Sequence, residues 1–364
     1  MDVGRSFQET QLGKIVLVKG NEAIAMGAIE AGCRFYFGYP ITPQNDIPEY
    51  MSKHLPSVGG TFIQAESEIA SINMLLGAGS TGARAMTSSS SPGISLKQEG
   101  ISYLCGSQIP GVIVNMSRSG PGLGGISPSQ GDYFQATRGG GHGDYRTIVL
   151  APHSVQENYD LTMKAFDLAD KYRNPVVILG DALLGQMKEP LKMHGYRKKQ
   201  YARDWVLTGT KNRSRRLLKS LYLSEGELTD HNWLLYKKYQ SMKREIRFET
   251  QFVEGAKLIV VAFGSVARIL KTSIQMVRDR GMKVGLFRPI TLFPFPYNAL
   301  EKISLSIKNF MAVELNTGQM VEDLKLAVGH KKNQVDFYGR PPGSIPSPDE
   351  LYNEVKKVYK KRIG

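Results

Sequence analysis

Two glutamates, Glu66 and Glu68, are the side chains in this sequence best placed for chemistry. They lie two positions apart in QAESEIASINMLLGAG, at the start of a segment with the apolar spacing of a helix. An acid at a helix N-terminus interacts favourably with the helix dipole, and this role alone would account for Glu68. The alternative is a buried carboxyl group that hydrogen-bonds a nitrogen heterocycle. From spacing alone the helix-terminus role of Glu68 is favoured, and spacing assigns no role to Glu66.

Thr42 and Arg118 are candidates for binding a ligand at strand ends. Thr42 lies in YPITP, where two prolines restrict the backbone after an apolar run. Arg118 follows the β-branched run VIVN and precedes the glycine-rich SGPGLGG. An arginine in that position can clamp a carboxylate with two parallel hydrogen bonds. Without a ligand, YPITP would be an ordinary turn and Arg118 a surface arginine.

Three other polar segments give weaker signals. The serine run from Thr87 to Ser91 has no neighbouring His and Asp, and GxSxG is absent, so a hydrolase nucleophile is not indicated. GPGLGG lacks the following strand and acid of a dinucleotide-binding motif. We expect His142 to lie in a solvent-exposed loop, and TSSSSPG to be a tight turn from a strand to a helix.

The elements that must position these residues alternate between strand and helix. Apolar runs predict strands at 35–37, 62–63 and 83–86 and a helix over 66–78, with Ile69, Ile72, Leu75 and Leu76 facing inward. A second set predicts a strand at 258–262, a helix over 266–280 and a strand at 284–287. This alternation is typical of α/β domains with parallel sheets, which bind ligands at the carboxyl ends of their strands.

Length and composition are those of a globular protein with two domains. The chain has 364 residues, which is longer than a typical single domain of roughly 100–200 residues. Its hydrophobic content of 41% is that of an ordinary globular protein. We expect a polar tail over residues 1–14, an α/β domain over 15–190, a basic connector over 191–254 and a smaller α/β domain over 255–364. No run of about 18 apolar residues and no signal peptide is evident, so we expect a soluble cytoplasmic protein.

Charge and cysteine content narrow the classes of partner. The net charge is +14, and Tyr196 to Ser220 contains nine Lys or Arg against the single acid Asp204. A solvated connector or a contact with another subunit accounts for this stretch better than a nucleic-acid site, because no RNA-binding motif accompanies it. Cys33 and Cys105 are the only cysteines, so the chain cannot by itself hold an iron–sulfur cluster or a cysteine-type zinc.

Several long motifs, taken in order, resemble the alpha subunit of 2-oxoacid:ferredoxin oxidoreductases. They are GNEAIAMGAIEAGCRFYFGYPITP, QAESEIASINMLLGAGSTGARAMTSSSSPGISLKQEGISYL, GPGLGGISPSQGDYFQATRGGGHGDYR and DKYRNPVVILGDALLGQM, followed by FGSVARI, FRPITLFPFP and VELNTGQM. The branched-chain (2-oxoisovalerate) type is the most similar and the 2-oxoglutarate type is next. The resemblance implies a thiamine diphosphate-binding, pyrimidine-type domain followed by a transketolase C-terminal-like domain.

The resemblance also implies an activity from anaerobic metabolism. Such enzymes decarboxylate a 2-oxoacid on thiamine diphosphate, transfer the acyl group to coenzyme A and pass electrons through iron–sulfur clusters to ferredoxin. Carried over residue by residue, Glu68 would hydrogen-bond the aminopyrimidine ring as the catalytic residue, and Pro40, Ser89 and Ser90 would line the cofactor site. Thr42 and Arg118 would hold the 2-oxoacid.

One departure from complete thiamine enzymes bears on the partners. Those enzymes hold Mg²⁺ and the diphosphate with a GDG motif, and this chain has only GDALLGQ. The resemblance therefore implies no metal site here, a beta subunit that carries Mg²⁺ and the diphosphate, and gamma and delta subunits that carry the iron–sulfur clusters. Two other hypotheses stay open: a self-sufficient thiamine-dependent decarboxylase, and a nucleic-acid-binding protein that uses the connector.

Overall fold

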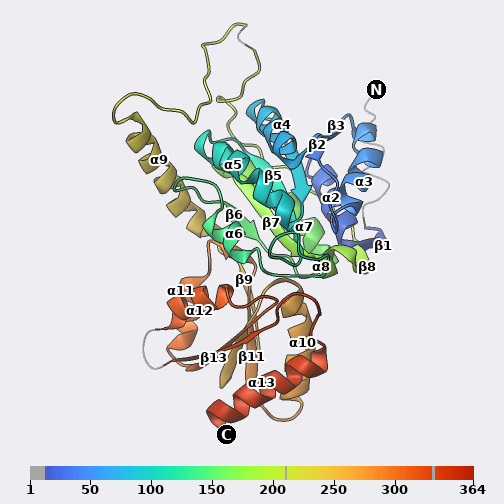
Figure 1. The fold of residues 1–364 in the computed structure, drawn as a ribbon, viewed down its shortest axis with the longest axis vertical. Helices are drawn as coiled ribbons and strands as arrows, with labels where there is room; N and C mark the ends of the chain where they lie inside the picture. Colours follow the sequence, from blue (N-terminus) through green and yellow to red (C-terminus); the bar gives the residue numbers. More distant parts are fainter. Residues whose placement is uncertain (1–12, 210, 330–332) are drawn as a thin grey trace.

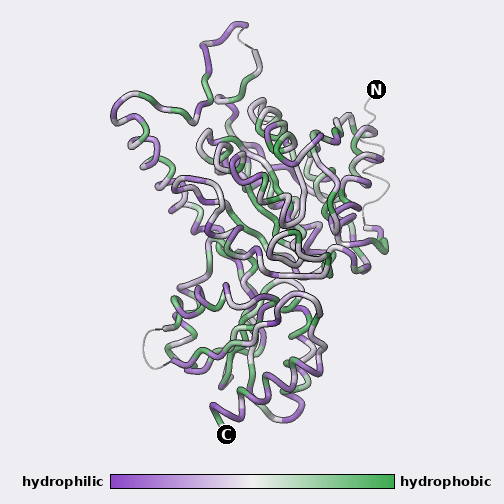
Figure 2. The backbone as a smooth tube through the Cα atoms, viewed as in Figure 1, coloured by the Kyte–Doolittle hydropathy of each residue, from purple (hydrophilic) through white to green (hydrophobic). Residues whose placement is uncertain are grey.

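The computed structural model describes residues 13–209, 211–329 and 333–364. Most of the predicted polar tail, residues 1–12, lies outside the described residues. Two central sheets, each flanked by helices, lie one above the other along the long axis of the molecule (Figure 1). Hydrophobic residues follow the strands at the centre of both (Figure 2). The predicted α/β class with parallel sheets is confirmed.

The larger sheet has seven strands, parallel except at one edge. In spatial order they are β12 (Thr291–Phe293), β6 (Ile148–Leu150), β7 (Pro175–Asp181), β5 (Gly111–Ser117), β4 (Ala85–Ser89), β2 (Phe35–Gly38) and β3 (Thr61–Gln64). The helices between them are α2 (Gly20–Glu30), α3 (Asp46–His54), α4 (Glu68–Ser80), α5 (Ser91–Gly106), α6 (Tyr133–Arg138), α7 (Val155–Tyr172) and α8 (Ala182–Gln186), with the short 3-10 turn η1 (Pro56–Val58). α4 packs on α5, and α2 packs on α7.

The smaller sheet has five strands and is parallel except for β9. In spatial order they are β14 (Gln334–Gly339), β13 (Asn309–Glu314), β10 (Leu258–Val261), β11 (Val284–Pro289) and β9 (Phe248–Gln251). Its helices are α10 (Gly264–Arg278), α11 (Tyr297–Ser304), α12 (Met320–Val328) and α13 (Pro348–Ile363). Among the helices that the structure describes, none has both the length and the apolar character needed to cross a membrane.

Three short strands cross the predicted domain limits. β8 (Lys188–Lys192) pairs with β1 (Ile15–Lys19), β9 lies within the predicted connector but pairs with β11, and β12 lies within the predicted second domain but pairs with β6. Strands of three to five residues are too short to show a clear apolar periodicity. The sequence therefore does not indicate which sheet edge each of them pairs with. The division at 14, 190 and 254 remains a prediction.

The rest of the basic connector returns to the larger domain. Residues 193–226 form no helix or strand where they are described, and α9 (Glu227–Met242) follows, ending in the 3-10 turn η2 (Lys243–Glu245). The Tyr196 hydroxyl accepts a hydrogen bond from the buried Arg84 at 2.9 Å, and a His231 ring nitrogen lies 2.7 Å from the Gly106 carbonyl oxygen. Leu217, Leu221, Leu223 and Trp233 nevertheless remain exposed.

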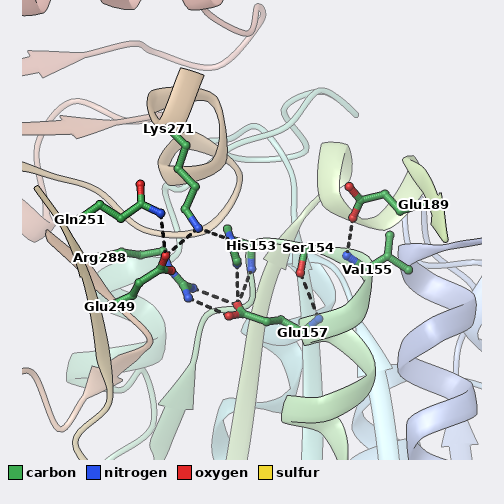
Figure 3. Close-up of polar contacts among 9 residues, drawn as sticks. All are labelled: His153, Ser154, Val155, Glu157, Glu189, Glu249, Gln251, Lys271 and Arg288. Atoms are coloured by element: carbon green, nitrogen blue, oxygen red, sulfur yellow. Dashed lines mark hydrogen bonds and ion pairs between the residues drawn. The ribbon is translucent and has the colours of Figure 1, made fainter. Parts of the chain in front are cut away.

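A polar cluster joins the two domains at the N-terminus of α7 (Figure 3). Arg288 of β11 is 1% exposed, and its guanidinium group bonds Glu157 of α7 at 2.7 Å and Glu249 of β9 at 2.9 Å. Lys271 adds a bond to Glu249 at 2.8 Å. Burial alone would raise the pKa of Glu157, but hydrogen bonds from His153 and Arg288 lower it to about 2. The cluster therefore holds an ionised Glu157 between the domains at neutral pH.

Removing the cation from this cluster should destabilise the protein. Arg288→Met leaves Glu157 and Glu249 facing each other without their shared partner, and breaking a buried pair in this way costs about 3 kcal/mol. We expect a lower thermal unfolding midpoint by calorimetry. Lys357→Met, which breaks the exposed pair with Glu354, is the control and should leave the midpoint nearly unchanged.

The same cluster gives a pH dependence with a definite sign. Because the pKa of Glu157 is lowered on folding, its contribution is complete above about 4.5 and is lost as pH falls toward 2. The difference in midpoint between wild type and Arg288→Met should therefore shrink over that range. A variant as stable as wild type at pH 7 would contradict the role of the cluster.

Candidate active site

The predicted site residues come together at one edge of the larger sheet. Thr42 follows β2, Ser89 ends β4, and Arg118 follows β5; these three strands are neighbours and run parallel. Their carboxyl ends therefore lie at the same edge, where open α/β sheets bind ligands. The edge faces the smaller domain, since Asp181 at the end of β7 accepts a hydrogen bond from Ser265 of α10.

Glu68 is buried and Glu66 is exposed, which separates the two candidate carboxylates. Glu68 is 7% exposed and is the first residue of α4, where the Ser67 hydroxyl caps the helix by accepting from the Ala70 N–H at 3.1 Å. The helix thus runs over 68–80 rather than the predicted 66–78, because Ser67 provides the cap. The prediction that Ile69 faces inward was wrong: it is 49% exposed.

The Glu68 carboxyl group lies against the first turn of α5. A Cβ atom placed on Gly93 would stand 2.7 Å from Glu68 Oε1 and 2.1 Å from Ser89 Oγ. Real Cβ atoms essentially never show contacts this short, so any side chain at residue 93 would force Ser89 Oγ and the Glu68 carboxyl group to move. Glycine at residue 93 is the feature that lets a buried acid occupy this position.

Arg118 and Thr42 are in direct contact, although through the backbone of Thr42. Arg118 Nη1 donates to the Thr42 carbonyl oxygen at 3.0 Å, and Nη2 donates to the Leu123 carbonyl oxygen at 3.2 Å. The arginine is 8% exposed, and its buried Nε has no partner among the described residues. Thr42 and Pro40 are exposed. The arginine therefore joins two loops and keeps one unused donor.

The serine run supplies further polar atoms without a partner. Ser89 and Ser90 are fully buried, and neither hydroxyl bonds another described residue. A buried polar group without a partner costs about 1–3 kcal/mol unless water or a ligand satisfies it. Ser88, by contrast, is 2.6 Å from the Tyr36 hydroxyl and also bonds Gln44. The turn thus has two free hydroxyls, and that of Ser89 lies with the Glu68 carboxyl group against Gly93.

A cleft of about 440 Å³ lies between the domains, next to the end of the serine run at Ser91. Its walls include Ser91, Arg118 and Asp132 from the larger domain and Asn316 from the smaller one. Ser91 holds the wall together, since its hydroxyl donates to Asp132 Oδ2 at 2.6 Å and accepts from the Arg118 N–H at 2.9 Å. The cleft thus has polar side chains on both walls and reaches the candidate arginine.

The second domain fixes the far side of this cleft. The Gln130 side chain donates to the Phe263 carbonyl oxygen at 2.9 Å and accepts from the Leu315 N–H at 3.0 Å. Asn316 donates to the Gln130 carbonyl oxygen at 2.9 Å. Burial raises the pKa of Glu314, whose carboxyl group also accepts from the Met320 and Val321 amides at the start of α12. The motif VELNTGQM thus clamps the loop that carries Asp132.

The acid of the GDALLGQ segment, Asp181, already has hydrogen-bond partners within the protein. Asp181 is 2% exposed, accepts from the Leu184 N–H at 3.0 Å and bonds the Ser265 hydroxyl, and burial raises the pKa of its carboxyl group. In the part of the chain that the structure describes, no three His, Cys, Asp or Glu side chains gather as metal ligands do. Burial raises the pKa of both cysteine thiols to about 12, so neither is a nucleophile at neutral pH.

Comparisons with known proteins decide the family. Residues 26–249 match the family model described as pyruvate flavodoxin/ferredoxin oxidoreductase, thiamine diP-bdg, and residues 256–351 match pyruvate:ferredoxin oxidoreductase core domain II. The chain belongs to the 2-oxoacid:ferredoxin oxidoreductase family. The predicted resemblance, oxidoreductase class and fold are therefore confirmed, and nucleic-acid binding is set aside as the function.

Relatives within this family span nearly the whole chain. Ketoisovalerate oxidoreductase subunit VorB of Methanothermobacter marburgensis is 48% identical, covering 94% of this chain and 97% of that protein. 2-Oxoglutarate synthase subunit KorA of Archaeoglobus fulgidus is 38% identical, covering 93% of this chain and 98% of that protein. This order agrees with the predicted one, in which the branched-chain type precedes the 2-oxoglutarate type.

Solved structures agree on the fold. A chain of the 2-oxoglutarate:ferredoxin oxidoreductase from Magnetococcus marinus, with 2-oxoglutarate, coenzyme A and succinyl-CoA bound, superposes with a TM-score of 0.85 at 28% identity. The match covers 95% of this chain and 65% of that one, so this chain spans about two thirds of its length. A split gene transketolase, at a TM-score of 0.59 and 11% identity, shares the fold.

Sequence reasoning did not identify four residues beside the site: Gly93, Lys97, Asn115 and Asp132. Asn115 donates to Asp132 Oδ2 at 2.8 Å, in contact with Ser91. A usable signal existed for Lys97, because it lies three positions after Ile94 on the buried face of α5. The other three gave none, since their partners are distant in sequence. His142 is exposed, as predicted.

Gly93→Ala should displace the Glu68 carboxyl group, because the added methyl group would overlap Ser89 Oγ and Glu68 Oε1. In the assembled enzyme we expect 2-oxoacid oxidation to fall by at least about tenfold. Gly77→Ala is the matched control: it lies in α4 with nothing within 4 Å of the new Cβ, and should keep full activity with equal or greater stability. Equal activities of the two variants would contradict the packing described for Glu68.

Proposed function

We propose that this chain is the alpha-type subunit of an enzyme that oxidatively decarboxylates 2-oxoisovalerate to an acyl-CoA and CO₂ and reduces ferredoxin. The observation that carries the proposal is the buried Glu68 carboxyl group beneath Gly93, in a domain of a family described as thiamine diphosphate-binding. The 48% identity to a ketoisovalerate oxidoreductase subunit supports the substrate.

The residues around Glu68 fit the aminopyrimidine end of thiamine diphosphate. A buried carboxyl group can share a proton with a ring nitrogen, and the unpartnered hydroxyls of Ser89 and Ser90 leave polar atoms for the same ligand. Pro40, exposed two positions before Thr42, would flank the ring. When bound, thiamine diphosphate supplies the carbon nucleophile that attacks the carbonyl group of the 2-oxoacid. Glu68 would hold the ring in the orientation that this attack needs.

Arg118 and Thr42 would bind the carboxylate and carbonyl groups of the 2-oxoacid. Arg118 borders the cleft and has an unpaired Nε, and a guanidinium group is suited to a carboxylate. Its two other nitrogens bond the carbonyl oxygens of Thr42 and Leu123, so the cation is held in place before substrate arrives. The exposed Thr42 hydroxyl lies on the loop that Arg118 anchors.

The diphosphate end of the cofactor does not fit this chain. Asp181, the acid of GDALLGQ, is buried and occupied by Ser265 and the first turn of α8. We infer that Mg²⁺ and the diphosphate are held by a beta subunit and that the iron–sulfur clusters lie on gamma and delta subunits or domains. Coenzyme A and ferredoxin would be co-substrates of that assembly, in the cytoplasm. The exposed leucines of the basic connector support a subunit contact there.

A 2-oxoglutarate-specific enzyme is the second candidate. It is supported by the 38% identity to a 2-oxoglutarate synthase subunit and by the solved 2-oxoglutarate:ferredoxin oxidoreductase. The substrates differ in the side chain, where 2-oxoglutarate carries a second carboxylate.

Replacing Glu68 tests the proposed role of this residue. In the enzyme assembled with its partner subunits, Glu68→Gln should lower kcat by about 10²- to 10⁴-fold, because the amide cannot share a proton with the ring. The neighbouring Glu66→Gln, at an exposed position, is the control and should keep wild-type kcat. Rates are measured as 2-oxoisovalerate-dependent reduction of ferredoxin or viologen.

Two results would change this conclusion. Equal losses in the two variants, or none in Glu68→Gln, would refute the assignment of Glu68. A higher kcat/KM for 2-oxoglutarate than for 2-oxoisovalerate in the wild-type enzyme would favour the second candidate.

A further inference from the structure

A lysine is fully buried directly behind Glu68. Lys97 of α5 is 0% exposed, and it lies one helical turn after Gly93, on the same face of the helix. α4 and α5 approach closely here, since a Cβ on Gly100 would stand 2.5 Å from the Ile72 side chain. The ammonium group is therefore enclosed between the two helices and β4.

The Lys97 ammonium group bonds three neutral oxygens. Nζ donates to Thr87 Oγ1 of β4 at 2.9 Å, to the Glu68 carbonyl oxygen at 3.4 Å and to the Ser71 hydroxyl. Three donors match three acceptors, and two of these acceptors belong to the first turn of α4. The lysine thus ties the start of α4, including the backbone of Glu68, to the neighbouring strand.

A buried cation with neutral partners is costly and calls for a compensating role. The charged group that acts on Lys97 is Glu68, which faces it from α4, while β4 offers the Thr87 hydroxyl. The acid of α5, Glu99, is exposed and accepts from the Tyr103 hydroxyl. Burial lowers the pKa of Lys97 to about 7, and the Glu68 carboxylate acts in the opposite direction. A methionine of similar length would fill the same volume without that cost.

We propose that Lys97 is a positioning residue for Glu68: its ammonium group holds the first turn of α4 against β4 and so keeps the Glu68 carboxyl group in place beneath Gly93. A neutral amine has one donor hydrogen fewer and no charge, so its bonds to the three oxygens weaken when Lys97 loses its proton. Positioning is therefore strongest in the protonated form. The inference rests on the proposed function, in which Glu68 contacts the aminopyrimidine ring.

The test measures a property of the bound cofactor rather than turnover. In the assembled enzyme loaded with thiamine diphosphate, exchange of the thiazolium C2 proton for deuterium is followed by quenched-flow NMR. Lys97→Met should slow this exchange by about tenfold at pH 6. The ratio of wild-type to variant rates should fall several-fold between pH 6 and pH 8.5, while KM for the 2-oxoacid stays unchanged.

A second lysine provides the matched control. Lys238 of α9 also has its pKa lowered by burial, to about 8, but it bonds the Arg173 carbonyl oxygen, away from Glu68. Lys238→Met should leave the exchange rate and its pH dependence as in wild type. If Lys97→Met does not fold, Thr87→Val removes one acceptor at nearly constant volume and should slow exchange in the same direction.

Parallel measurement of Glu68→Gln separates the two levels of the inference. Slow exchange in Glu68→Gln with wild-type exchange in Lys97→Met and Thr87→Val would refute the role of Lys97 alone. Wild-type exchange in Glu68→Gln would refute the proposed function itself. Equal slowing in Lys97→Met and Lys238→Met, or a ratio independent of pH, would show a general structural effect and would overturn the proposal.

Discussion

The Glu68 carboxyl group is buried under the first turn of α5, and the packing of the residues around it depends on this burial. An acid inside a protein requires space and polar partners. Gly93 supplies the space, since any side chain there would overlap the carboxyl oxygen, and the Ser67 cap starts α4 at Glu68. Small residues continue along the contact, where Gly100 lies against Ile72. The glycines of α5 thus allow α4 and α5 to pack closely around the buried Glu68 carboxyl group.

The two domains meet at the carboxyl ends of their strands, and this arrangement makes the cleft. The larger domain contributes Arg118 and Asp132, and the smaller domain holds the Asp132 loop through Asn316 and its neighbours. Arg288 reinforces the contact away from the cleft by joining Glu157 and Glu249. In the proposed function the site has residues suited to a ring and a carboxylate, whereas no cluster of metal ligands lies among the described residues. This asymmetry is the physical basis for assigning the other half to a partner subunit.

Much of the fold and the site could be predicted because the signals are local. Alternating apolar runs indicated the parallel strands, and parallel strands bring Thr42, Ser89 and Arg118 to one edge whatever their separation in sequence. The choice of Glu68 over Glu66 came from the family resemblance, since burial is decided by contacts with α5. Ile69 was misplaced: it is the second residue of α4 and is exposed, although Ile72 and Leu75 further along the helix are buried. The pairings of β9 and β12 and the bonds of Lys97 depend on elements far away in the chain, which periodicity does not report.

In the proposed function this chain supplies half of a thiamine diphosphate site. The most direct measurement is isothermal titration of thiamine diphosphate with Mg²⁺ into the purified chain, into the partner subunit with the diphosphate site, and into their mixture. We expect saturable binding only in the mixture, together with the appearance of 2-oxoisovalerate-dependent electron transfer. Tight binding and turnover by the chain alone would refute the shared site and would indicate a self-sufficient thiamine-dependent enzyme.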